Sequence, residues 1–185
     1  QLAAILDGLR ALGSGRVLGE VLALVMDSAL EVTKAERLHA RGWALYTARD
    51  YEKAADLLEQ SGKLGGNYAA HDAYYAAHAR SRAQQDERAI EMYEKVAQRF
   101  RNSSFAENAR FRSARLFYVM GRWKEAARSY ATYLAKHGKD GRFLEQARFE
   151  QAISWLVGGE PARAAKTLGA LADEEKSEHE TAMLR

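Results

Sequence analysis

The amino-acid sequence predicts an all-α protein built as an array of antiparallel helix pairs. Three observations point to this class: a phrase that recurs four times, apolar residues at helical spacing around each phrase, and a composition that favours helices. The chain has 185 residues, of which 47% are hydrophobic and 29% charged, and it contains a single proline. Such a composition is typical of a folded chain rather than a disordered one.

The recurring phrase defines a unit of helix, tight turn and helix. It is clearest in "RDYEKAADLL" and "GRWKEAARSY", and every copy places an alanine after the turn. A fixed period of about 20–50 residues is typical of repeat arrays. The four alanines are Ala54, Ala89, Ala126 and Ala164, at spacings of 35, 37 and 38 residues.

A helical segment precedes each phrase, and a small residue in it allows close packing on the helix that follows. These first helices are expected at residues 35–48, 70–83, 107–120 and 144–157, with Gly42, Ala77, Ala114 and Ala152 as the small residues. A large apolar side chain follows three residues later in three units, and Arg80 departs from this pattern in the second. One hairpin cannot bury both of its faces, so we expect neighbouring pairs to stack on a continuous core.

The repeats divide the chain into two parts. Residues 35–185 hold four units, at about 35–69, 70–106, 107–143 and 144–178. Residues 1–34 fit no unit, and the "GSG" at 13–15 predicts two helices joined by a turn, either a cap on the array or a degenerate repeat. The chain starts at Gln1 and stops inside a helical pattern, so we expect it to be a piece of a longer protein.

The phrases resemble the tetratricopeptide repeat, with its small residue, large residue, Gly-Asp-Tyr-like turn and alanine in order. The stretches "ARDYEKAADLL" and "MGRWKEAARSY" carry the resemblance best, and it covers about residues 35–175. It implies a right-handed superhelix, or α-solenoid, in which the first helix of each unit lines the concave side. The units are longer than the usual ~34 residues, and the proline common near the end of a unit is missing.

Within that superfamily, the long loops are similar to those of bacterial cell-envelope members. The stretch "GRFLEQARFEQAISWLVGGEPARAAKTL" resembles the superhelix that precedes the catalytic domain of soluble lytic murein transglycosylases. This resemblance implies a periplasmic or cell-envelope location and an association with peptidoglycan. A cytoplasmic location stays open, because no signal peptide is visible in this chain.

No residue pattern in the chain predicts catalysis. There is no cysteine, and no serine lies in a nucleophile elbow. The Glu-Ser pair typical of lytic transglycosylases is absent, and Glu145 and Glu150 are five residues apart, so they do not share a helix face. We therefore expect a non-catalytic chain without a cofactor, and no apolar stretch reaches the ~20 residues of a membrane span.

Two other kinds of site are suggested by residue types. His71 and His78 are seven residues apart on one helix face, and His39 lies at the matching face of the neighbouring unit. They could contribute to a metal site, but we expect a polar lining of the groove and no metal. Residues 80–128 carry twelve basic and six acidic side chains, which could favour an anionic partner. The arginines fall on several faces, so nucleic acid is not expected.

The predicted binding surface is the concave face of the first three units. Aromatic and arginine side chains dominate binding hot spots, and both gather at the positions that the family turns inward. Carried over by the resemblance, the candidates are Glu36, His39, Trp43, Tyr46, His71, Tyr74, His78, Arg82, Asn108, Phe111, Arg115 and Tyr118.

The sequence thus supports two hypotheses of function. The first is a non-catalytic scaffold of a lytic transglycosylase, holding a peptidoglycan strand and the rest of the parent protein. The alternative is a protein–protein adaptor that binds a peptide segment of a partner in its groove. The identity of the ligand and the oligomeric state are not predicted.

Overall fold

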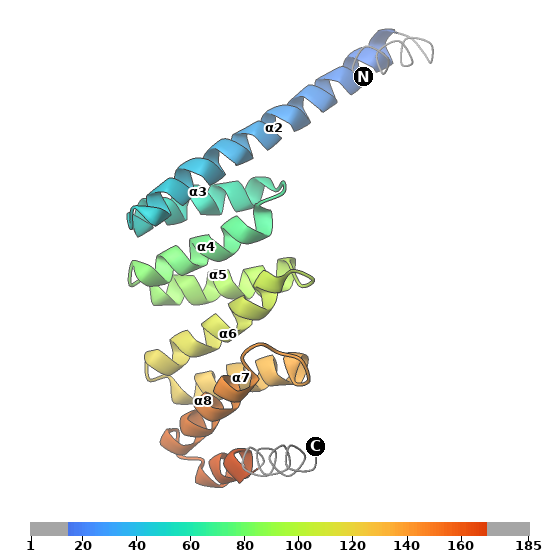
Figure 1. Ribbon diagram of the computed structural model, residues 1–185. Coiled ribbons are helices and arrows are strands. Elements are labelled where there is room, and N and C mark those ends of the chain that lie inside the picture. Colours follow the sequence, from blue (N-terminus) through green and yellow to red (C-terminus); the bar gives the residue numbers. More distant parts are fainter. Residues whose placement is uncertain (1–14, 170–185) are drawn as a thin grey trace, which may run out of the picture.

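The computed structural model describes residues 15–169 of the chain, and these form a stack of helices without strands. The helices are α2 (Gly15–Thr47), α3 (Tyr51–Leu64), α4 (Ala69–Arg82), α5 (Asp86–Arg99), α6 (Ser104–Val119), α7 (Trp123–His137) and α8 (Leu144–Val157). Residues 161–169 are helical as well. Consecutive helices run antiparallel and zigzag from one end of the stack to the other (Figure 1). The predicted all-α array of helix pairs is confirmed.

The four hairpin turns share one backbone motif. The second residue after each first helix has a positive φ: 65° at Arg49, 61° at Gln84, 73° at Gly121 and 86° at Gly159. The next residue's N–H binds the carbonyl five positions back, as in Gln85 N to Arg80 O at 2.9 Å. This is the Schellman motif, which satisfies carbonyls at a helix end. The residue with the positive φ lies five residues before the alanine of each recurring phrase. The turn geometry therefore repeats with the same period as the sequence.

The small residues at the helix crossings are all buried. Ala54, Ala89 and Ala126 have no exposed surface, and Ala164 is 2% exposed. Gly42 leaves room for Leu58, whose Cγ would lie 2.8 Å from a Cβ added at the glycine. Larger side chains from the second helices, including Tyr93, Tyr130 and Tyr133, fill the space between pairs. The sequence period therefore marks the contacts where helices approach most closely.

The array is curved, with the first helices on its inner side. Among the described helices, α4 contacts α6 and α6 contacts α8, but no contact of similar extent joins α3 to α5 or α5 to α7. First helices of neighbouring units thus lie closer together than second helices do. The concave surface is consequently built from α4, α6 and α8, continued by the end of α2.

The boundary predicted at residue 34 falls inside a helix, and the assignment of residues 1–34 to a cap or a degenerate repeat stays a prediction. Residues 15–34 and 35–47 form the single helix α2, which extends well beyond α3 (Figure 1). No glycine or proline lies between Glu20 and Arg41, so nothing in the backbone ends the helix at residue 34. The first of the two predicted helices, in residues 1–12, lies outside the described residues. The part of α2 past α3 exposes Leu24, Met26 and Leu30.

Candidate functional site: an aromatic and basic surface on the concave side

An aromatic and histidine cluster joins the end of α2 to α4. Trp43 stacks on Tyr46 with ring centroids 5.3 Å apart, and its edge meets Tyr75 at 5.0 Å. His71 lies 4.5 Å from Tyr75 and 5.1 Å from Trp43 between ring centroids. These rings are half-buried, so the cluster is both a packing contact between units and part of the accessible face.

Two histidines of this cluster converge on one carboxylate. Nδ1 of His39, on α2, lies 2.7 Å from Oδ1 of Asp72, and Nδ1 of His71 lies 2.9 Å from the same oxygen. The other oxygen, Oδ2, accepts a hydrogen bond from the Ser61 hydroxyl at 2.6 Å. Burial raises the pKa of Asp72, but these hydrogen bonds outweigh it and hold the pKa below its ordinary value. Within the described residues, this is the one group whose geometry suits a metal ion.

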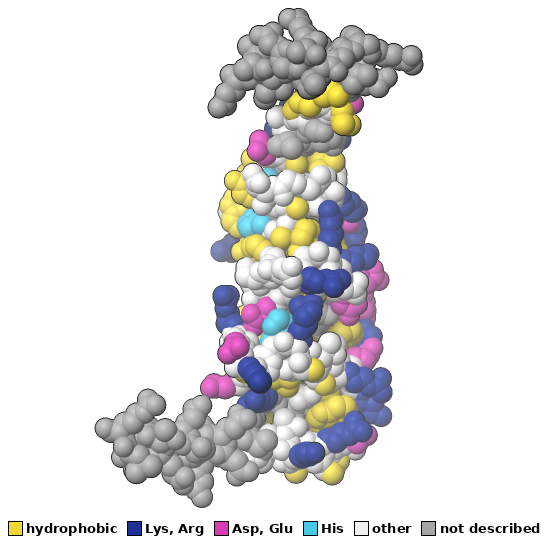
Figure 2. Space-filling view, turned by 90° about the vertical axis from the view of Figure 1, so that its right-hand side faces the viewer, with side chains coloured by type: hydrophobic (Ala, Val, Ile, Leu, Met, Phe, Trp, Pro, Cys, Tyr) yellow, Lys and Arg dark blue, Asp and Glu magenta, His cyan; other side chains and the backbone are white. Residues whose placement is uncertain are grey.

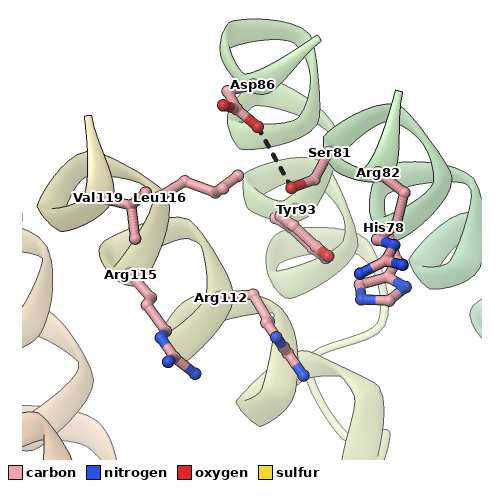
Figure 3. Close-up of a pocket in the computed structure, with 9 residues that line it drawn as sticks. All are labelled: His78, Ser81, Arg82, Asp86, Tyr93, Arg112, Arg115, Leu116 and Val119. Carbon is pink, nitrogen blue, oxygen red and sulfur yellow. Dashed lines mark hydrogen bonds between the residues drawn. The ribbon is translucent and has the colours of Figure 1, made fainter. Parts of the chain in front are cut away.

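A basic pocket of about 480 Å³ lies next to this cluster, between α4, α5 and α6. Figure 3 shows Arg112 and Arg115 reaching side by side from α6, across from His78 and Arg82 on α4. The lining residues are His78, Ser81, Arg82, Asp86, Tyr93, Arg112, Arg115, Leu116 and Val119. Three guanidinium groups thus face a pocket that contains one carboxylate, so its field favours an anion.

The pocket holds a neutral histidine. Burial, then the charges of Arg112 and Arg82, lower the pKa of His78 to about 4. Burial raises the pKa of Tyr46 to about 12, so its phenol keeps its proton near neutral pH. Tyr46 therefore donates its hydroxyl hydrogen to Nδ1 of His78. That assignment leaves Nε2 of His78 as an N–H donor.

The floor of the pocket carries an unused donor. Tyr93 is 1% exposed, and its hydroxyl has no hydrogen-bond partner within the described residues. Burial raises the pKa of Tyr93 well above its ordinary value, so the hydroxyl stays protonated. A buried hydroxyl without a partner is costly, and an acceptor entering the pocket would satisfy it.

The arginines of the pocket differ in how firmly they are held. Arg82 donates to the hydroxyl of Tyr51 at 3.5 Å and lies over the Tyr51 ring at 5.3 Å. Nε of Arg115 is 4.0 Å from a Glu150 oxygen, which is the limit of an ion pair. Arg112 lowers the pKa of the neighbouring His78, and the described residues show no carboxylate paired with it. Arg112 and Arg115 are exposed and so are available to a ligand.

The structure brings together most of the predicted groove residues, though not all of them. His39, Trp43, Tyr46 and His71 meet in the aromatic cluster, whereas His78, Arg82 and Arg115 border the pocket. Asn108 and Tyr118 are half-buried on α6, and Glu36 is exposed on α2. These positions agree with the predicted concave face and do not test whether it binds a partner.

Two candidates belong to the core instead. Phe111 is 2% exposed and stacks on Phe143 at 4.3 Å, so its expected place in the groove lining is wrong. Tyr74 is 7% exposed and packs in the core cluster with Tyr93. Both sit on first helices, where the long loop or the next unit covers them. A family position that faces inward is therefore not always accessible.

The sequence reasoning missed Asp72, Tyr93 and Arg112 as site residues. The helical spacing predicts that Tyr93 lies in the core, and its ring does. The spacing does not predict that its hydroxyl lines the pocket. Arg112 lies one turn before Arg115, and this spacing of three residues was the signal that both share a face. Asp72 follows His71 directly, and only the fold shows that it also lies beside His39.

Comparisons with known proteins agree with this architecture. Residues 73–103 and 108–140 match the tetratricopeptide repeat. The two matched segments fall on the pairs α4–α5 and α6–α7, and the pocket is lined by residues of α4, α5 and α6. The match supports a non-catalytic, protein-binding scaffold. A search of curated proteins returned no match.

Two solved structures share the fold. Both hold nearly identical TPR-like repeats of a Podosopora anserina protein described as a kinesin light chain. The first has a TM-score of 0.59 at 16% identity and covers 88% of this chain and 89% of its own. The second, a variant of that protein with one residue replaced, has a TM-score of 0.57 at 18% identity, with 89% and 90% covered. At such identities the likeness concerns the fold alone.

No membrane-spanning segment was found in the described part of the chain: none of its helices is both long and apolar enough.

In the face shown in Figure 2, Lys and Arg side chains lie at several levels of the stack and are interspersed with Asp and Glu. On this face, therefore, positive charge does not form one continuous patch.

Proposed function

We propose that the chain is a non-catalytic scaffold that binds an acidic, extended segment of a partner protein in the pocket between α4 and α6. The observation that carries the proposal is the pocket's donor set. Arg82, Arg112 and Arg115 face it, and the buried Tyr93 hydroxyl lacks a partner within the described residues. A carboxylate side chain would accept hydrogen bonds from this set and offset the positive charge.

The neighbouring aromatic cluster extends the surface along the same side. Trp43 and Tyr46 present half-buried rings one unit away from the pocket. Aromatic and arginine side chains give much of the binding energy at protein interfaces. A segment running across the first helices would place an acidic residue in the pocket and an apolar residue against these rings.

A fluorescence anisotropy titration with a short labelled polyglutamate peptide tests the proposal. We expect binding that weakens with rising salt and that falls at least tenfold in Arg112→Glu and Arg115→Glu. Arg128→Glu is the matched control, since Arg128 is exposed on the second helix α7. A polyglutamine peptide that bound equally well, or a control that weakened binding as much, would contradict the proposal.

A second candidate function follows from the sequence resemblance to lytic transglycosylases. We propose as an alternative that the chain is the superhelix of such an enzyme in the periplasm, in contact with peptidoglycan. The observation that favours it is the ring pair Trp43 and Tyr46, because aromatic faces stack on sugar rings. Co-sedimentation with insoluble peptidoglycan tests it. Salt-resistant binding that Trp43→Ala abolishes and Arg112→Glu preserves would support the alternative over the acidic-segment scaffold.

A further inference from the structure

We propose that His39, His71 and Asp72 form a binding site for one divalent transition-metal ion, with Zn²⁺ as the best fit. The three ligand atoms come from two helices of different units and all lie within 4.8 Å of one another. This site is separate from the basic pocket and would join α2 to α4.

The distances are close to those of a metal site. Both Nδ1 atoms lie 2.7 to 2.9 Å from Oδ1 of Asp72. Zinc binds imidazole nitrogen and carboxylate oxygen at about 2.0–2.2 Å, so tetrahedral ligands are roughly 3.3 Å apart. Each of the two nitrogen–oxygen distances would lengthen by about half an ångström to admit the ion.

The surroundings hold the ligands in place. Ser61 is 1% exposed, and its hydroxyl lies 2.6 Å from Oδ2 of Asp72 and 2.9 Å from the carbonyl oxygen of Ala35. The ring of His39 stacks on Tyr68 at 3.9 Å with an interplanar angle of 6°. Such outer contacts orient metal ligands and are needed for tight binding.

The charge balance also favours a cation. The Asp72 side chain is fully buried, and within the described residues its ion-pair partners are His39 and His71, with no Lys or Arg. Buried carboxylates are paired or coordinate metals. A divalent ion would supply this carboxylate with both positive charge and coordination.

The site is reachable from solvent. The side chains of His39 and His71 are 18% and 25% exposed, so an ion can enter and a water can complete its coordination. Two imidazoles and one carboxylate are a donor set that Zn²⁺ accepts readily. Three protein ligands with an open position leave room for a fourth ligand from solvent or from a bound partner.

Isothermal titration of the EDTA-stripped chain with ZnCl₂ tests the site. We expect one ion per chain, and at least a tenfold loss of affinity in His39→Gln and in His71→Gln. Glutamine can still donate a hydrogen bond to Asp72 but is a poor zinc ligand. His137→Gln, on α7, is the matched control and should bind Zn²⁺ as the unmodified chain does.

Two results would overturn the proposal: no stoichiometric binding, or equal affinity in the three variants. Circular dichroism establishes that each variant is folded. Should one of them fail to fold, NMR of the unmodified chain decides the question. Zinc must then shift the ring resonances of His39 and His71 more than those of His137, and an equal or absent shift rejects the site.

Discussion

Arg80 of α4 is buried and forms an ion pair with the exposed Asp56 of α3, at the position where three other units carry Leu45, Phe117 and Trp155. Arg80 is 2% exposed, and Gln85 accepts a second hydrogen bond from it at 3.2 Å. Its Nε has no partner within the described residues. The second unit therefore closes its hairpin with a charged pair where its neighbours use apolar packing.

An apolar side chain should serve at this position as well as the arginine does. Burying the Arg80 guanidinium carries a desolvation cost, and its removal leaves no buried carboxylate unpaired, because Asp56 is 56% exposed. We expect Arg80→Leu to leave the free energy of unfolding within ~1 kcal/mol of the unmodified chain. Arg80→Ala should lower it by about 2–3 kcal/mol, because it also leaves a cavity. Urea denaturation measures both, and equal losses would contradict the expectation.

The Schellman turns predict a stabilising change. Gln84 has a φ of 61°, which costs a residue with a side chain about 1 kcal/mol relative to glycine. We expect Gln84→Gly to raise the free energy of unfolding by up to ~1 kcal/mol, and Gly121→Ala, at a φ of 73°, to lower it by a similar amount. Thermal denaturation of both variants measures whether the first raises and the second lowers the stability. A loss of stability in Gln84→Gly would show that its side chain outweighs the backbone strain.

Close helix packing predicts that alanine is not tolerated at Gly42. A Cβ there would lie 2.8 Å from Cγ of Leu58, which is fully buried. We expect Gly42→Ala to cost about 1–3 kcal/mol, which exceeds the ~1 kcal/mol that alanine gains in a helix. Gly169→Ala is the control, since nothing lies within 4 Å of its added Cβ. Equal urea midpoints for the two variants would refute the packing argument.

The neutral state of His78 predicts a loss of stability in mild acid. Its pKa is about 4 in the folded chain against 6.5 in a free histidine, so the unfolded chain binds this proton first as the pH falls. The free energy of unfolding should therefore decline between pH 6.5 and about 4, and then stop declining from this source. Half-burial limits the loss to about 1–2 kcal/mol.

Carboxylates titrate in the same range, so the measurement needs a reference. His78→Gln keeps a polar side chain but has no proton to gain. We expect the stability difference between the unmodified chain and His78→Gln to shrink as the pH falls from about 7 to about 4.5. A difference that stayed constant across this range would mean that His78 titrates normally in the folded chain.

The fold was predictable from residues whose role depends on volume and period. Ala54, Ala89 and Ala126 recur because two helices cross there, and steric exclusion acts in the same way in each unit. The repeat period does not reveal the continuous helix α2, because residues 1–34 fit no unit although the helix runs through them into the first. The absence of any glycine or proline from 21 to 41 was the local signal that the helix continues.

The site was less predictable because it depends on pairs across units. His39 and Asp72 are 33 residues apart, so only the superhelix places them in contact. Phe111 has the residue type of a binding hot spot, yet Phe143 from the following loop covers it. The Arg80 anomaly was visible in the sequence, whereas its partner Asp56 on the preceding helix was not.

The unbroken helix α2 projects from one end of the array. Its 33 residues span about 50 Å at ~1.5 Å per residue, and it extends well beyond the 14-residue helix α3 that packs on it (Figure 1). The same helix carries Trp43 and Tyr46 near its C-terminal end. A force on α2 near Leu24 would therefore act on the aromatic and histidine cluster as well. A displacement of the N-terminal part of α2 would therefore also move the part of the concave surface that its C-terminal end carries.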